Sequence, residues 1–272
     1  MVGEKNLSAV DKFFESVYEI LDKIKETQRE NILKAANLIA ESLAKGGLVH
    51  TFGTGHSEII AEEPWARAGG LAVVNIITGR DLTTMSGISS FVERIAQYAD
   101  ALLASQDVKS EDSIIIISNS GINALPVEMA LKTKSMGLKV IAITNLAHSK
   151  SAKARGSGRH PSGKRLFEVA DVVLDNCGVP GDAVLEMEGL PIKGQKAIGT
   201  STITGAFLMD AVLAQVIRNL ADKGVTPPVL ISGNIEVTEE DRRRMREAMM
   251  RWKDRMPVYE WLVKYEKLYG AK

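Results

Sequence analysis

The sequence predicts an α/β protein built on a doubly wound, mostly parallel five-stranded sheet, with helices before the sheet and a helical arm after it. Three observations predict this class. Short apolar, β-branched runs alternate with stretches of helical periodicity through the middle of the chain. Several of these runs lead into loops rich in Gly, Ser or Thr. Residues 114–117 are consecutive isoleucines, as in strands that are covered on both faces.

Residues 9–45 predict two helices, because apolar side chains recur there every three or four positions. The first series is Phe13, Phe14, Val17, Ile20, Leu21 and Ile24. The second series is Ile32, Ala35, Ala36, Ile39 and Leu43. The pair Gly46-Gly47 ends the second helix.

The central region predicts five strands separated in several places by helices. The strands are expected at residues 48–52, 72–77, 113–117, 139–144 and 171–174. Helical periodicity is found at residues 88–104 and 124–136. Ligands of such sheets lie beyond the carboxyl ends of the strands, so the loops that follow the strands are the expected site.

Residues 145–165 form a long connection that contains six basic residues and no acidic one. Two interpretations stay open: a lid that attracts phosphate, or a solvated loop. Residues 199–220 predict a largely apolar helix. Its apolar residues occupy more than one face, which favours burial at a subunit interface.

The C-terminal part predicts an appended helical arm. Thr238 followed by three acidic residues is typical of a helix start, and apolar residues then line one face: Met245, Met249, Trp252 and Met256. A last short helix is expected between Tyr259 and Tyr269. We therefore expect an N-terminal helical segment (1–46), a central domain (47–234) and the arm (235–272).

Composition narrows the function classes. In 272 residues Lys+Arg and Asp+Glu each number 34, so the formal charge is zero, which argues against nucleic acid as a partner. The start lacks the apolar core of a signal peptide, and no apolar run long enough to span a membrane is expected. The single Cys177 excludes an internal disulfide. These features favour a cytoplasmic protein without membrane partners.

Three loops predict a phosphate site. Each links a strand or loop to a helix start, where backbone N–H groups, hydroxyls and the helix dipole attract anions. The expected phosphate-binding or substrate-binding residues are Gly55, His56, Ser57, Ser118, Asn119, Ser120, Asn123, Ser201 and Thr202. Three such loops in one domain indicate a phosphorylated, hydroxyl-bearing ligand such as a sugar phosphate.

The order Gly-Thr-Gly-His-Ser, Ser-Asn-Ser-Gly and Gly-Thr-Ser-Thr over an alternating sheet resembles the SIS (sugar isomerase) family. The stretch from Gly55 to Gly70, together with residues 159–164, is similar to an SIS subgroup described as phosphoheptose-isomerase-like. The resemblance implies that Ser57, Ser118, Ser120 and the Ser201-Thr202 pair contact phosphate or sugar hydroxyls. Many family members carry Thr where this chain has Asn123, so the resemblance does not extend to a phosphate contact there.

Two acidic residues are candidates for the catalytic base of an aldose–ketose isomerase. Glu63 has Arg67 at i+4 and is expected to form an ion pair with it, whereas Glu62 has no basic partner at that offset. Glu62 is therefore the preferred base. It also lies just ahead of Pro64, and the N-acetylmuramic acid 6-phosphate etherase of the family has a catalytic Glu ahead of Pro. The alternative is that both are solvated helix carboxylates.

Histidines are the candidates for the acid that opens the sugar ring. His148 follows the fourth strand and is preferred, and His160 lies in the basic connection. His50 lies inside a strand and is expected to be structural. The catalytic His of phosphoheptose isomerase lies on a C-terminal helix, and residues 199–223 contain no His.

No cofactor is expected. The chain has no Cys pair and no His-x-x-x-His spacing for zinc, and no complete dinucleotide or P-loop motif.

The preferred function is thus a sugar-phosphate isomerase. The alternatives are a non-catalytic phosphosugar sensor and an etherase-like lyase. Its many apolar helix faces further predict a homodimer or homotetramer.

Overall fold

The computed structural model describes residues 7–152, 158–256 and 258–259. Its centre is the parallel five-stranded sheet that the sequence predicts, and the order of its strands is β2-β1-β3-β4-β5. The strands are β1 (Val49–Phe52), β2 (Val74–Ile77), β3 (Ser113–Ile117), β4 (Lys139–Thr144) and β5 (Val172–Asp175). This order reverses between β1 and β3, so the loops after these two strands flank the crevice where α/β sheets bind ligands.

Alternate side chains of the buried strands enter two hydrophobic cores, one on each face of the sheet. Ile115 and Ile117 of β3 belong to one core, and Ile114 and Ile116 belong to the other. All four are at most 2% exposed. A continuous apolar run therefore marks a strand with helices on both sides, as expected.

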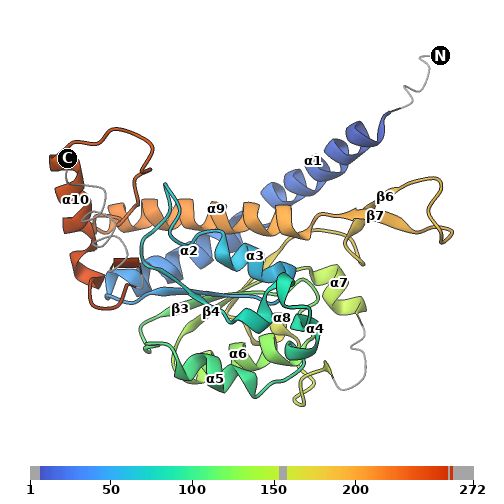
Figure 1. Ribbon diagram of the computed structural model, residues 1–272, viewed down its shortest axis with the longest axis horizontal. Helices are drawn as coiled ribbons and strands as arrows, with labels where there is room; N and C mark the ends of the chain where they lie inside the picture. The colour runs from blue at the N-terminus through green and yellow to red at the C-terminus, as the bar shows by residue number, and fades with distance from the viewer. Residues whose placement is uncertain (1–6, 153–157, 257, 260–272) are drawn as a thin grey trace.

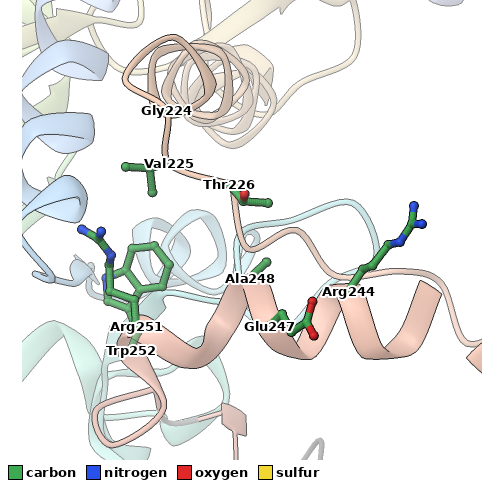
Figure 2. Close-up of a pocket in the computed structure, with 8 residues that line it drawn as sticks. All are labelled: Gly224, Val225, Thr226, Arg244, Glu247, Ala248, Arg251 and Trp252. Carbon is green, nitrogen blue, oxygen red and sulfur yellow. The ribbon is translucent and has the colours of Figure 1, made fainter. Parts of the chain in front are cut away.

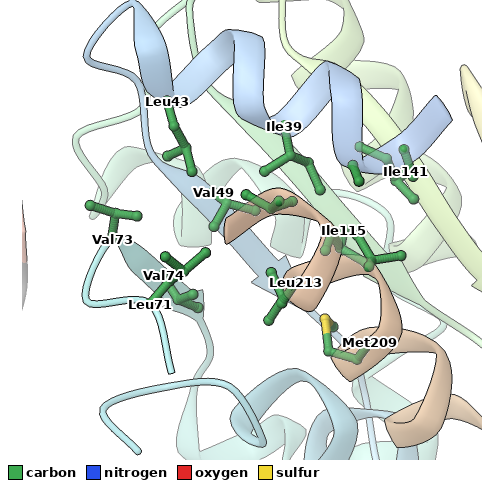
Figure 3. Close-up of a cluster of buried hydrophobic side chains, with 14 of the residues drawn as sticks. Ile39, Leu43, Val49, Leu71, Val73, Val74, Ile115, Ile141, Met209 and Leu213 are labelled. Carbon is green, nitrogen blue, oxygen red and sulfur yellow. The ribbon is translucent and has the colours of Figure 1, made fainter. Parts of the chain in front are cut away.

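Helices cover both faces of the sheet (Figure 1). One layer holds α2 (Arg29–Ala44), α3 (His56–Glu62) and α9 (Ser201–Asp222), and the other holds α5 (Tyr98–Ala104), α6 (Ala124–Ser135) and α8 (Leu166–Val169). Figure 3 shows how Ile39 and Leu43 of α2 and Met209 and Leu213 of α9 meet the sheet around Ile115.

The two N-terminal helices form as predicted. Ser8 caps α1 (Ala9–Thr27) in a capping box with Asp11, and Gln28 separates α1 from α2. The beginning of α1 projects away from the body (Figure 1). Val10, Phe14 and Tyr18, which are spaced at i, i+4 and i+8, form an exposed stripe there.

Three segments differ from the expectation. The single helix expected at 88–104 is instead α4 (Ser89–Val92) and α5, preceded by the short turns η1 (Arg80–Leu82) and η2 (Thr84–Ser86). The connection 145–165 begins with a short helix, α7 (Leu146–Ser151). An antiparallel hairpin, β6 (Ala183–Glu186) and β7 (Lys196–Gly199), was not expected and projects beyond the start of α9 (Figure 1).

The C-terminal arm begins as predicted, with Thr238 capping α10 (Glu239–Met249) in a capping box with Asp241. The turn η4 (Met250–Trp252) follows. Met249, Trp252 and Met256 are buried in the same core as α2 and α9, so the predicted apolar face is confirmed. The helix expected between Tyr259 and Tyr269 lies almost entirely outside the described residues. The domain boundaries at 46 and 234 remain predictions.

One helix bears on the expectation that no segment spans a membrane. By length and composition, α9 alone among the helices of the described residues is apolar enough to cross a membrane. Its side chains Leu208, Met209, Val212 and Val216 are fully buried against α2 and the sheet. The hydrophobicity of α9 is therefore that of a core helix.

Candidate functional site

The loop after β1 is shaped by two glycines. A Cβ at Gly53 would lie 2.3 Å from the carbonyl oxygen of Ser57, so only glycine fits the turn into α3. Gly55 has a φ of 57°, and its N–H donates to the carbonyl of Leu82 at 2.8 Å. The loop thus delivers His56 and Ser57 at the first turn of α3, at the carboxyl edge of the sheet.

The loop after β3 is held by its own polar groups. The Ser118 hydroxyl accepts the N–H of Gly121 at 3.1 Å, and Gly121 has a φ of 59°. The backbone carbonyl of Asn119 accepts the N–H of Asn145 at 3.1 Å, which ties this loop to the end of β4. Ser118 is buried, whereas Asn119 and Ser120 are half-buried.

Asn123 stands at the N-cap of α6, but its side chain does not cap that helix. The neighbouring Glu93 contacts both loops: its carboxyl accepts a 3.0 Å hydrogen bond from the Thr54 hydroxyl, and its carbonyl accepts the N–H of Leu125 in α6 at 2.9 Å. Glu93 therefore links the two loops. Burial raises the pKa of Glu93, and the polar side chains of Thr54 and Asn123 oppose the rise.

One small pocket joins the three predicted loops. It is lined by His56, Ser57, Ile60, Ile117, Asn119, Ile143, Asn176 and Ser201. The Asn176 amide, which follows β5, donates to the Asn119 side chain at 2.9 Å. Segments separated by more than a hundred residues thus meet at the sheet edge where parallel α/β folds bind ligands.

The start of α9 already holds a carboxylate. Asp182 accepts the N–H groups of Thr200 and Ser201 at 3.0 and 2.8 Å, and the Ser201 hydroxyl at 2.7 Å. The third loop, expected to bind phosphate through Ser201 and Thr202, is therefore capped by the chain itself. Thr202 is half-buried in the first turn of α9.

Glu62 and Glu63 lie at the far end of α3. Glu63 forms the predicted ion pair with Arg67. Glu62 is exposed and is the last residue of the helix, about 9 Å along the axis from His56 at 1.5 Å per residue. Neither carboxylate belongs to the described residues that line the pocket.

A nearer carboxyl, Glu58, is in the first turn of α3 and is only 2% exposed. Burial raises its pKa, and so does the neighbouring Glu62 carboxylate, whereas the 2.7 Å hydrogen bond donated by the Thr78 hydroxyl lowers it. Glu58 and Glu62, at i and i+4, are thus neighbouring carboxyl groups on one helix.

The two candidate histidines have different surroundings. His148, in α7, accepts the N–H of Gly181 through Nδ1 at 3.2 Å. His160 is 9% exposed and lies between the Glu128 carboxylate at 2.6 Å and the Ser162 hydroxyl at 2.7 Å. Neither is among the described residues that line the pocket.

His50 is fully buried and hydrogen-bonds Asp112 at 3.0 Å and Asn75 at 2.8 Å, so its structural role is confirmed.

Sequence reasoning missed several polar residues around the site. Glu58 and Glu93 give no sequence signal beyond being acidic residues near the loops, and Asn176 lies in a segment more typical of a plain turn. The contact of Asp182 with the start of α9 depends on the β6–β7 hairpin, which the sequence did not predict. Among the described residues, no group of three or more His, Cys, Asp and Glu side chains is arranged to hold a metal ion.

A larger cavity, of about 470 Å³, lies at the other end of α9 (Figure 2). It lies between the turn after α9 and α10, next to Trp252. Its charged side chains pair within the chain: Arg244 with Glu240, Glu247 with Arg243, and Arg251 with the carbonyl of Ala44. The pocket at the sheet edge therefore remains the candidate site.

A family model described as SIS domain matches residues 12–145. A UPF0309 protein from Geobacillus thermodenitrificans is 39% identical over 251 residues, covering 92% of this chain and 97% of the relative. A second, from Caldanaerobacter subterraneus, is 41% identical over 241 residues, covering 88% and 96%.

Two solved structures share the fold at low sequence identity. The phosphoheptose isomerase from Francisella tularensis matches with a TM-score of 0.52 and 16% identity, over 78% of this chain and all of that one. Phosphoheptose isomerase GmhA from Neisseria gonorrhoeae matches with a TM-score of 0.50 and 16% identity, over 77% and 97%. The chain is thus an SIS-domain protein with a five-stranded α/β fold, and it belongs to the UPF0309 family.

Proposed function

We propose that the protein binds a sugar phosphate and isomerises it between the aldose and ketose forms. One observation carries the proposal: Ser57, Asn119 and Ser201, which come from three separate loops, line one pocket at the carboxyl edge of the sheet. Small hydroxyl and amide side chains around helix N-termini suit a ligand with one phosphate and several hydroxyls. The SIS fold supports the same class of ligand.

The phosphate belongs at the loop after β3 in this proposal. Ser118, Asn119 and Ser120 precede the N-terminus of α6, a helix of 12 residues whose dipole favours an anion. Ser57, which follows the loop after β1, lines the same pocket. Glu93, which is bonded to Thr54 and to the N–H of Leu125, helps to fix the two loops relative to each other.

Glu62 is the proposed base. It removes the proton from C2 of the aldose while O1 takes up a proton, which gives the enediol. The resulting carboxylic acid returns its proton to C1 while O2 gives up its hydroxyl proton and becomes the ketose carbonyl, so the net change on oxygen is one proton moved from O2 to O1. Because Glu62 is at the far end of α3, the sugar chain has to lie along that helix. The neighbouring Glu58 carboxyl is buried, which raises its pKa, and the charge of Glu62 raises it further. His148 is the proposed ring-opening acid.

The test is solvent deuterium exchange. The protein is incubated in D₂O with a panel of hexose, heptose and amino-sugar phosphates, and deuterium at C2 is followed by NMR. Exchange by the parent, with loss in Glu62→Gln and retention in Glu63→Gln, is expected. Binding without exchange across the panel would remove the isomerase proposal.

A phosphosugar sensor is the second candidate. Among the described residues that line the pocket there is no carboxylate, which favours binding without turnover. Normal binding of a sugar phosphate by both the parent and Glu62→Gln, with no activity in either, would favour the sensor. An etherase-like lyase would share the Glu62 base, and product analysis for released lactate distinguishes it from an isomerase.

We further propose a cytoplasmic homodimer or homotetramer. The exposed apolar side chains include Val10, Phe14 and Tyr18 on α1, and Ile203 and Phe207 on α9. Exposed apolar stripes of this kind are typical of association surfaces. Light scattering that finds only the 29.5 kDa species would contradict association.

A further inference from the structure

Asp182 sits in a turn whose geometry aims its carboxylate at α9. Its φ is 71°, a left-handed conformation that non-glycine residues rarely adopt. The turn is closed by the Asp182 N–H, which donates to the Val179 carbonyl at 3.0 Å. The neighbouring Gly181 N–H donates to His148 at 3.2 Å. An unfavourable backbone conformation is thus held in place by contacts on both sides.

The hairpin leaves space for this carboxylate. Ala183 at the start of β6 pairs with Gly199 at the end of β7, which brings Asp182 next to the first residues of α9. A Cβ at Gly199 would lie only 2.7 Å from Asp182 Oδ2. Any larger residue there would therefore displace the Asp182 side chain.

The Asp182 carboxylate takes the position that an anionic ligand of α9 would take. Its Oδ1 accepts the N–H groups of Thr200 and Ser201, and its Oδ2 accepts the hydroxyl of Ser201. These are the groups that a phosphate would use at the start of a 22-residue helix. A second anion is excluded there by space and by like charge.

We infer that Asp182 is a specificity-determining residue that closes the α9 side of the pocket to phosphate. This inference rests on the proposed function and adds the orientation of the ligand. The phosphate lies at the loop after β3. A hydroxyl of the sugar faces Ser201, whose own hydroxyl hydrogen is given to Asp182, so that its oxygen accepts hydrogen bonds. A sugar hydroxyl fits there, and a second phosphate does not.

The test counts inorganic phosphate bound per chain by equilibrium dialysis. Wild type is expected to bind one phosphate. Asp182→Gly removes the carboxylate at a φ that suits glycine and is expected to bind two. Asp182→Asn keeps a side chain of the same shape that can still cap α9, and is expected to bind one. Asp210→Ala, which removes an exposed carboxylate from the middle of α9, controls for net charge and is also expected to bind one.

The outcomes separate this inference from the proposed function. One phosphate on both wild type and Asp182→Gly, with circular dichroism showing both folded, would overturn the role of Asp182, as would two on wild type. If wild type binds neither phosphate nor any sugar phosphate, the proposed function fails. The role of Asp182 is then decided by whether Asp182→Gly gains a phosphate, since no gain overturns it.

Discussion

Arg255 of the C-terminal arm forms a two-pronged ion pair with Asp112, at the edge of the sheet opposite to the candidate site. Its Nη1 and Nη2 lie 2.9 and 2.8 Å from the two carboxylate oxygens of Asp112. Asp112 is fully buried, and it also accepts hydrogen bonds from His50 and from the N–H groups of Leu48 and Lys109. This cluster links the arm to the starts of β1 and β3.

Arg255→Ala is expected to destabilise the protein by about 3 kcal/mol, because it leaves a buried carboxylate without its cationic partner. Urea unfolding measures the loss. Arg243→Ala is the control: it removes an exposed arginine of α10 that pairs with Glu240, and should change the unfolding free energy by less than about 0.5 kcal/mol. Equal effects of the two variants would contradict a structural role for the Arg255–Asp112 pair.

The same cluster makes stability depend on pH in the acid range. Burial alone would raise the pKa of Asp112, but the hydrogen bonds from His50, Arg255 and the backbone outweigh it, and the pKa is lowered. Since the folded pKa lies below the unfolded value of about 3.9, the stabilisation is complete above about pH 5 and is lost progressively as the pH falls through the unfolded and then the folded pKa.

Asp112→Asn should therefore flatten the fall in unfolding free energy below pH 4, although it is less stable than wild type at neutral pH. Urea unfolding at several values between pH 2.5 and pH 7 is the measurement. A parallel fall in both proteins would show that other carboxylates cause the acid sensitivity.

The pKa of Glu58 is shifted in the opposite direction to that of Asp112, so its effect on stability has the opposite pH dependence. Its folded pKa is raised, first by burial, so its contribution to stability is present below the unfolded pKa of about 4.3 and is lost as the pH rises through the folded value. Glu58→Gln keeps the acceptor for Thr78 without an ionisable group. The unfolding free energy of wild type should therefore decrease relative to that of the variant as the pH rises from 4 to 8. Glu19→Gln, at an exposed position on α1, should show no such change.

The sheet could be predicted from the sequence because its strands are buried on both faces, and burial imposes a continuous apolar pattern. β3 is the clearest case, with Ile114–Ile117 at most 2% exposed. The hairpin could not be predicted. Its strands are partly exposed, and Ile198 of β7 is 52% exposed, so no periodicity marks them. Their pairing depends on contacts across a long connection between Glu186 and Lys196.

The loops of the candidate site could be predicted from the sequence, but the positions of its acidic residues could not. Gly55, Ser57 and Asn119 could be selected from the sequence, because each lies in a loop of small polar residues that follows a predicted strand. The partners of the acidic residues are set by the tertiary structure. Glu93 meets Thr54 because short turns and the short helix α4 replace the start of the single helix that periodicity predicted at residues 88–104. The carboxylate at α9 comes from Asp182, which is eighteen residues before Thr200 in the chain.

Gly53 tests whether the loop after β1 is required for ligand binding. Gly53→Ala would place a Cβ 2.3 Å from a backbone oxygen of Ser57, so the loop has to move and carry Ser57 away from the pocket. We expect at least about a tenfold loss of affinity for phosphate or sugar phosphate, equivalent to about 1.4 kcal/mol. Isothermal titration calorimetry measures it.

The control for Gly53 is Gly79→Ala, after β2 at the same edge of the sheet. Its backbone is extended, with a φ of −154°, and the nearest atom to an added Cβ is the Tyr98 hydroxyl at 3.4 Å, an ordinary contact. This variant should bind ligand as wild type does. If Gly53→Ala is folded and keeps its affinity, the loop after β1 does not hold the ligand, and the phosphate must be bound by the loop after β3 alone.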